Sequence, residues 1–148
     1  MESIVILFGT ESGNAEMAAD DIASALEALD IDTQVVPMNE FDVSTLPAAG
    51  TAILISSTYG EGAMPETAEP FYKKLLADRP DLRELRFAAF GLGDSTYKTF
   101  NNAIDTLVVQ VESLGASQVG STGRHDASSG KLIADVASEW VTSTFGRA

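Results

Sequence analysis

The chain has 148 residues, enough for one domain with a buried core, and we expect residues 1–148 to form a single domain. It contains no cysteine, which excludes a disulfide framework and a thiolate metal site. Its net charge of −13 makes nucleic acids and anionic membranes poor partners, because their phosphates would be repelled.

The first part of the chain predicts a strand, a helix and a second strand. Residues 4–8 form an unbroken apolar run that ends at Gly9, a pattern typical of a strand buried on both faces. No basic region precedes this run and no apolar run is as long as a membrane span, so we expect a cytoplasmic protein without a signal peptide. Residues 14–29 carry apolar side chains at helical spacing, and the more polar residues 33–37 suit a strand at a sheet edge.

The middle of the chain continues the alternation. Residues 39–50 read as a connection, and residues 51–56 form the next apolar run, which predicts a third strand. A second helix is predicted from Pro65 onward, and it should stop before Pro80 because proline cannot continue a helix.

The last part predicts two more strands and two more helices. Residues 85–90 read as a strand, and residues 101–114 read as a helix closed by Gly115. Residues 116–122 form a weaker strand, and residues 132–145 form a terminal amphipathic helix.

Five strands that alternate with helices predict an α/β fold with an open parallel sheet and helices on both faces. In such sheets, ligands bind outside the carboxyl ends of the strands, where the strand order reverses. Polar loops follow the first, third and fourth predicted strands, so all three should start from one edge of the sheet.

The first of these loops, residues 10–15, suits a phosphate group. Thr10 and Ser12 offer hydroxyl donors, and Gly13 lets the backbone approach a ligand closely. The loop opens a helix, whose first N–H groups and dipole favour an anion. It contains no lysine, so it is not the triphosphate-binding loop G-x-x-x-x-G-K-[ST]. The simpler interpretation is an ordinary helix cap by Ser12 or Asn14.

The other two loops suit a flat aromatic ring. Residues 57–62 and 91–97 each place one tyrosine, Tyr59 or Tyr97, among glycines. Either tyrosine alone could be a packing residue, but two of them at neighbouring strand ends can stack on both sides of a ring. A phosphate site below two aromatic side chains predicts binding of flavin mononucleotide (FMN).

The three loops together resemble those of short-chain flavodoxins, over essentially the whole chain. Residues 8–16 match the phosphate loop of that family, and residues 57–62 and 92–101 match its two ring loops. The pattern is also similar to MioC-type flavodoxins and to the FMN domains of sulfite reductase and cytochrome P450 reductase. The resemblance implies a flavodoxin-like, doubly wound, five-stranded parallel sheet of order 2-1-3-4-5, with helices on both faces.

The resemblance also implies which residues bind the cofactor: Thr10, Glu11, Ser12, Gly13, Asn14, Ala15, Ser57, Thr58, Tyr59, Gly60, Glu61, Gly62, Leu92, Gly93, Asp94, Tyr97, Phe100 and Asn101. In the family, residues at the positions of Thr10 through Ala15 contact the phosphate, and Tyr59 and Tyr97 lie on opposite faces of the ring. Three positions depart from the common pattern: many flavodoxins have threonine at Ala15, tryptophan at Tyr59 and an acid at Lys98.

The chain offers no catalytic acid, base or nucleophile for a substrate of its own. His125 is the only histidine, and its polar surroundings predict a solvated loop residue. The chemistry therefore belongs to the cofactor, and the protein tunes it, as expected for an electron carrier. Acids such as Glu61 and Asp94 near the ring would disfavour its fully reduced anionic form and lower the potential of the second electron.

The net negative charge of the chain lies in its first half. Residues 1–72 contain no lysine or arginine, whereas residues 73–148 contain all 9 basic residues. A basic partner would be attracted to such a surface, although a general role in solubility is the simpler explanation. We expect a monomer that receives electrons from an NAD(P)H-dependent flavodoxin reductase and passes them to acceptor redox enzymes, with these partners docking on the acidic face.

Three other functions are alternatives to an electron carrier. A phosphoreceiver domain needs an acidic pair after the first strand, where this chain has Gly9 and Thr10; Asp20 and Asp21 lie within the predicted helix. An FMN-dependent NAD(P)H:quinone-type reductase needs room for a substrate over the ring, which two tyrosines would restrict. A flavin-free relative could act as a protein-binding module.

Overall fold

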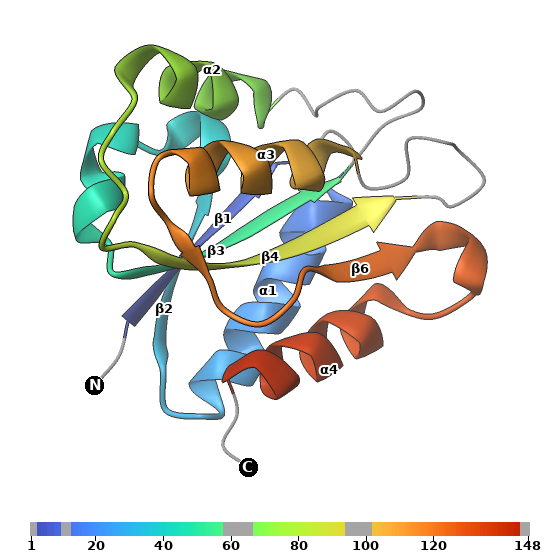
Figure 1. Cartoon of the computed structure of the whole chain (residues 1–148). Helices are drawn as coiled ribbons and strands as arrows, with labels where there is room; N and C mark the ends of the chain where they lie inside the picture. The colour runs from blue at the N-terminus through green and yellow to red at the C-terminus, as the bar shows by residue number, and fades with distance from the viewer. Residues whose placement is uncertain (1–2, 10–12, 58–66, 94–101, 146–148) are drawn as a thin grey trace.

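The structure is a computed structural model that describes residues 3–9, 13–57, 67–93 and 102–145 (Figure 1). The strands in these ranges are β1 (Ser3–Gly9), β2 (Asp32–Pro37), β3 (Thr51–Ser57), β4 (Arg86–Gly93), β5 (Ser117–Gln118) and β6 (Gly123–Asp126). The helices are α1 (Asn14–Glu27), α2 (Glu69–Asp78), α3 (Asn102–Ser113) and α4 (Ile133–Phe145). Short 3-10 helices cover Met38–Glu40, Val43–Ala48 and Ala127–Ser129.

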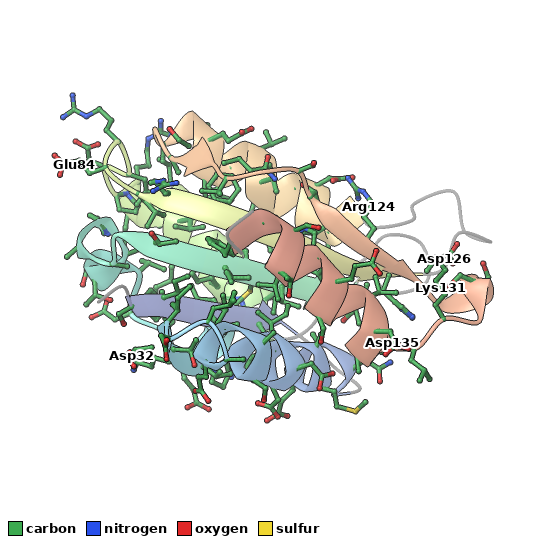
Figure 2. The ribbon with its side chains drawn as sticks, turned by 90° about the horizontal axis from the view of Figure 1, so that it is seen from below. Asp32, Glu84, Arg124, Asp126, Lys131 and Asp135 are labelled. Carbon is green, nitrogen blue, oxygen red and sulfur yellow. The ribbon has the colours of Figure 1, made fainter. Side chains whose placement is uncertain are left out.

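The strands form one parallel sheet of order β2-β1-β3-β4-β5, and β6 also pairs with β4. This order confirms the doubly wound fold predicted above. Because all strands run the same way, the sheet has an amino edge, near Asp32 and Glu84, and a carboxyl edge, near Asp126 (Figure 2). Helices α1 and α4 cover one face of the sheet, and α2 and α3 cover the other (Figure 1).

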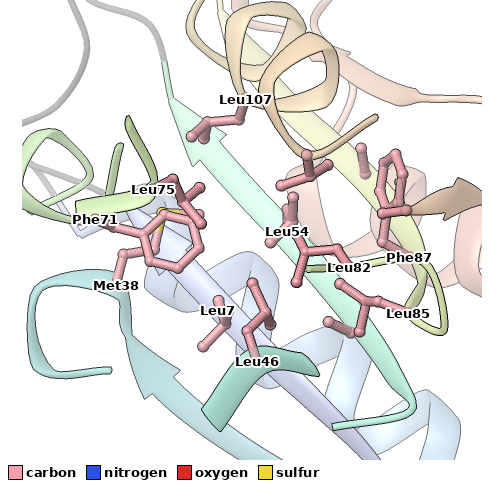
Figure 3. Packing of buried hydrophobic residues seen from close by; sticks show 14 of the residues in the cluster. Leu7, Met38, Leu46, Leu54, Phe71, Leu75, Leu82, Leu85, Phe87 and Leu107 are labelled. Carbon is pink, nitrogen blue, oxygen red and sulfur yellow. The ribbon is translucent and has the colours of Figure 1, made fainter. Parts of the chain in front are cut away.

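The protein has two hydrophobic cores, one on each face of the sheet, and successive residues of each central strand alternate between them. Leu7 and Leu54 pack with Phe71 of α2 and Leu107 of α3 (Figure 3). Residues one position away point to the opposite face and pack against α1 and α4. A strand covered on both faces must be apolar at every position, which explains the unbroken apolar runs in the sequence.

The last predicted strand differs from expectation, because it is split in two. Instead of one strand over residues 116–122, β5 ends at Gln118 and the chain returns to the sheet as β6. Between them Gly120 adopts a left-handed φ of 68°, and the indole Nε1 of Trp140 donates to the carbonyl oxygen of Ser121 at 3.0 Å. This bond to α4 holds the connection outside the ladder, so two short strands fill the fifth position.

The environment of His125 was also predicted wrongly. It lies in β6, is only 7% exposed, and its Nε2 lies 2.8 Å from the carbonyl oxygen of Lys131. The polar neighbours that suggested a solvated loop belong to a strand of which one face is buried.

Within the described ranges, no helix combines the length and apolar composition needed to cross a membrane.

Candidate functional site

Three adjacent strands end together at the carboxyl edge. In the parallel register, Gly9 of β1 lies beside Ser56 of β3, and Ser57 lies beside Leu92 of β4. The strand order reverses at β1, which has β2 on one side and β3 on the other. The predicted loops therefore start side by side, at the place where open α/β sheets bind ligands.

Helix α1 begins at this edge directly after a glycine. Gly13 precedes the helix with φ 91° and ψ −6°, a left-handed conformation that glycine adopts without strain. Its carbonyl accepts from the N–H of Met17 at 3.1 Å, and it has no side chain with which to cap the helix. This arrangement suits an anion at the helix N-terminus.

The side chains of Asn14 and Ala15 differ in what they can offer a ligand. Asn14 is exposed at the first position of α1, whereas Ala15 is fully buried in the core. Ala15 can therefore present only its backbone to the site. The hydroxyl of the threonine that many flavodoxins have at this position is missing here.

A buried hydroxyl without a partner marks the end of β3. Ser57 is 8% exposed, and its Oγ makes no hydrogen bond within the described part of the chain. The neighbouring Ser56 is satisfied, because its Oγ donates to the carbonyl oxygen of Ser57 at 3.0 Å. An unsatisfied buried hydroxyl costs about 1–3 kcal/mol, so a ligand that accepts its hydrogen bond would recover this energy.

Ser57 also lies on the appropriate face. It is paired with Leu92, whose side chain packs in the core between the sheet and helices α1 and α4. Paired residues of neighbouring strands point to the same face, so Ser57 points to the face on which α1 starts. A helix N-terminus and a hydroxyl without a partner among the described residues therefore lie on the same face of the sheet at its carboxyl edge, and the described residues fit a phosphorylated ligand such as FMN.

Two further residues that were predicted to bind the cofactor, Leu92 and Gly93, lie at the end of β4. Leu92 is a core residue, 4% exposed, and can meet a ligand only through its backbone. Gly93 is the last residue of the strand and lies beside Asp126 of β6. The remaining predicted contacts lie outside the described residues: Thr10, Glu11, Ser12, Thr58, Tyr59, Gly60, Glu61, Gly62, Asp94, Tyr97, Phe100 and Asn101.

Close packing ties the end of β1 to the start of α2. A Cβ atom on Gly9 would lie 2.5 Å from the Cβ of Ala68, far inside van der Waals contact. Ala68 is fully buried and immediately precedes α2. The absent side chain of Gly9 thus allows α2 to approach the strand that leads into the predicted phosphate loop.

Strand β6 supplies residues that the sequence did not reveal. The Arg124 Nη2 lies 2.7 Å from Oδ1 of Asp105, which connects β6 to the first turn of α3, and His125 points to the opposite face. The sequence of β6 is Gly-Arg-His-Asp, which contains no apolar side chain, so no hydrophobic pattern could have identified this strand. No cluster of metal-binding side chains occurs among the described residues.

The electrostatics of α1 follow from its acidic outer face. Glu16, Asp20 and Glu27 are exposed on it, and Asp21 is partly buried. Desolvation, together with the neighbouring charge of Asp20, raises the pKa of the Asp21 carboxyl above its usual value. The helix therefore presents a negative surface along its length, and Glu16 is its acid in the first turn, nearest the carboxyl edge.

Comparison with known proteins agrees with this geometry. The sequence model of the flavodoxin family matches residues 6–140. The chain belongs to the flavodoxin family. It is 37% identical to protein MioC of Escherichia coli K12, over 97% of this chain and 96% of that protein. It is also 36% identical to NADPH-dependent diflavin oxidoreductase 1 of Cryptococcus neoformans, over 95% of this chain but only 23% of that protein.

Solved structures give the same result. A mutant of flavodoxin from Pseudomonas aeruginosa superposes with a TM-score of 0.86 at 27% identity, and the match covers 95% of each chain. Oxidised flavodoxin 2 from Bacillus cereus superposes with a TM-score of 0.85 at 29% identity, and the match covers 96% of this chain and 97% of that one. Flavodoxins transfer electrons by means of bound FMN, so the cofactor and the electron-transfer function predicted from the sequence are confirmed. The alternative of a quinone-type reductase is not favoured.

Proposed function

We propose that this chain holds FMN at the carboxyl ends of β1, β3 and β4, and carries single electrons from an NAD(P)H-dependent flavodoxin reductase to acceptor redox enzymes. Bound FMN supplies the redox chemistry, and the protein supplies binding, orientation and electrostatics. In this proposal residues 10–15 and Ser57 bind the phosphate end, and Tyr59 and Tyr97 cover the two faces of the ring. The other residues predicted from the sequence lie along its edges.

The unpartnered hydroxyl of Ser57 is the observation that supports this site most directly. It is buried at the junction of the three strand ends and on the face where α1 begins. Without a ligand there, none of the described residues would satisfy this buried hydroxyl. We therefore propose that Ser57 donates a hydrogen bond to an oxygen atom of FMN.

Ser57→Ala and Ser56→Ala form a matched pair that tests this assignment. Both remove one buried hydroxyl from neighbouring positions, but only Ser56 has a partner within the described residues. Ser57→Ala should weaken FMN binding roughly tenfold, as measured by quenching of flavin fluorescence, and should leave the stability of the flavin-free protein unchanged or slightly higher. Ser56→Ala should lower that stability by about 1 kcal/mol and change FMN affinity much less.

The assignment would be refuted if Ser57→Ala bound FMN as tightly as the wild type. It would also be refuted if both substitutions weakened binding equally, because a general loosening of β3 would then explain the result. Failure of the wild-type protein itself to bind FMN would contradict the whole proposal.

The proposed docking surface for redox partners is the acidic face formed by α1 and its neighbours. Support comes from the absence of any lysine or arginine in residues 1–72 and from the exposed acids of α1. Diflavin oxidoreductases, which contain a segment similar to this chain, indicate redox enzymes as the class of partner. Rates of electron transfer to a basic partner should fall as ionic strength rises, and rates independent of salt would contradict steering by charge.

The remaining parts of the proposal concern the protein as a whole. We propose a single domain that acts as a monomer in the cytoplasm, where reductases have access to NAD(P)H, without turnover of a substrate of its own. Nucleic acids and membranes are not proposed as partners. Steady oxidation of NAD(P)H by the purified protein in the absence of a reductase would contradict the carrier role and support an enzyme.

A further inference from the structure

The turn between β6 and α4 contains several hydrogen bonds that involve side chains. Asp126 Oδ1 accepts from both the N–H and the hydroxyl of Ser128, at 2.9 and 2.8 Å. The hydroxyl of Ser129 donates to the carbonyl oxygen of Asp126 at 2.7 Å and accepts from the N–H of Lys131 at 3.2 Å. Gly130 allows the reversal with a left-handed φ of 77°. These contacts make residues 126–131 a compact unit, which we call the β6–α4 turn.

His125 connects this turn to the sheet. Its Nε2 lies 2.8 Å from the carbonyl oxygen of Lys131, the last residue of the turn. A carbonyl can only accept, so Nε2 carries the proton and donates. The imidazole ring is buried. Its hydrogen bond joins the residue just before the turn to the last residue of the turn. The side chain of His125 therefore connects strand β6, which precedes the turn, to Lys131 at the end of the turn.

The turn lies beside the proposed cofactor site. In the register of the sheet, His125 is paired with Leu92 and Asp126 is paired with Gly93, the last residue of β4. Figure 2 shows Arg124, Asp126 and Lys131 together at the carboxyl edge. The turn therefore forms the lateral boundary of that edge, next to the strand end from which the third predicted loop continues.

We propose that His125 is a positioning residue of the FMN site: its bond to Lys131 holds the β6–α4 turn against the end of β4. The inference rests on the proposed function, because it concerns the same site. Without the bond, the Lys131 carbonyl would lose this donor, and the end of the turn would lose its connection to the His125 side chain of β6. The Gly93–Asp126 pairing would then be less restrained, and the position of the β4 end relative to FMN would be less well defined.

The structure suggests a conservative test, because glutamine and asparagine imitate different nitrogens of histidine. The amide nitrogen of glutamine reaches about as far as Nε2, whereas that of asparagine reaches only about as far as Nδ1. His125→Gln should therefore preserve the donor to Lys131, and His125→Asn and His125→Leu should lose it. Gln118→Leu is a matched control, since it removes a part-buried bond to Thr122 at 2.9 Å from β5, away from the carboxyl edge.

Two measurements separate positioning from general stability. In flavin-free protein, hydrogen exchange of the Ser128 and Lys131 amides should be roughly tenfold faster in His125→Asn and His125→Leu than in the wild type, and nearly unchanged in His125→Gln. The FMN dissociation constant should rise roughly three- to tenfold in the same two variants, and the one-electron potentials should shift. His125→Gln and Gln118→Leu should stay within about twofold of the wild type in FMN affinity.

Three results would overturn the proposal, and they are distinguishable. Equal FMN affinity and potentials in His125→Asn and the wild type would refute the positioning role and leave the proposed function intact. Equal losses in His125→Gln and His125→Asn would show that the donor at Nε2 is not what matters. A wild-type chain that binds no FMN would refute the proposed function together with this inference. If His125→Leu does not fold, the comparison of glutamine with asparagine still decides.

Discussion

Gly9→Ala tests the packing that brings α2 next to the end of β1. The new Cβ would lie 2.5 Å from the Cβ of Ala68, and 3.2 Å from both its Cα and the Sδ of Met38. The Met38 side chain can move away, because its thioether is flexible. Ala68 has no rotamer to change, so the backbone before α2 or the end of β1 must shift.

The expected effect is a net destabilisation of about 1–2 kcal/mol. Inserting a methyl group into a tightly packed core costs about 1–3 kcal/mol. Alanine recovers about 0.4–1 kcal/mol of this, because it restricts the unfolded chain more than glycine does and Gly9 does not have the positive φ that alanine would resist. The midpoint of thermal unfolding should therefore fall by roughly 3–8 °C.

The assay is thermal and urea unfolding of the flavin-free protein, so that ligand binding does not contribute to stability. Ala68→Gly removes the colliding methyl group and serves as the partner in a double-mutant cycle. By itself it should also destabilise, because Ala68 is fully buried and a buried methyl group contributes about 0.8 kcal/mol. The double variant should be about 1 kcal/mol more stable than the sum of the two changes predicts. Strict additivity, or a neutral Gly9→Ala, would refute the explanation by collision.

Two further predictions concern the opposite face of the sheet. Gly123→Ala should destabilise by about 3 kcal/mol, measured by urea unfolding, because its Cβ would lie 2.5 Å from Trp140 Cδ1 and 2.6 Å from Phe90 Cδ1; a loss below about 1 kcal/mol would contradict it. Asp21→Asn should raise the unfolding temperature at about pH 7 but not at about pH 3. The raised pKa of this carboxyl means that its charged form disfavours the folded state, so stability is lost as pH rises through that pKa. Asp20→Asn should recover less, because desolvation is the larger cause of the shift; equal stabilisation by Asp20→Asn, or no pH dependence, would argue against this cause.

The central strands could be predicted from sequence because each is long and apolar throughout. Residues 4–8 and 51–56 were expected as strands, and the structure extends them only to Ser3–Gly9 and Thr51–Ser57. Two buried faces require apolar residues at every position, so the signal does not depend on neighbouring elements. The same holds for the start of α1 after Gly13, where a glycine and a run at helical spacing coincide.

The fifth position of the sheet could not be predicted in the same way. β5 has two residues and β6 has four, which is too short for a periodic pattern. Their separation depends on Trp140, which lies in another element and binds the Ser121 carbonyl. The burial of His125 has the same origin, because its surroundings come from β4 and from the turn before α4.

Sequence alone determined the alternation of strands and helices, the three loops with their hydroxyl, glycine and tyrosine residues, and hence the family and its FMN. These features are local: each depends on composition and spacing within a short segment. Tertiary structure decided which serine hydroxyl at the end of β3 lacks a partner within the described residues, how Gly9 lets α2 approach, and how His125 closes the turn beside β4. These features depend on contacts between segments far apart in the chain, and no spacing within one segment records such contacts.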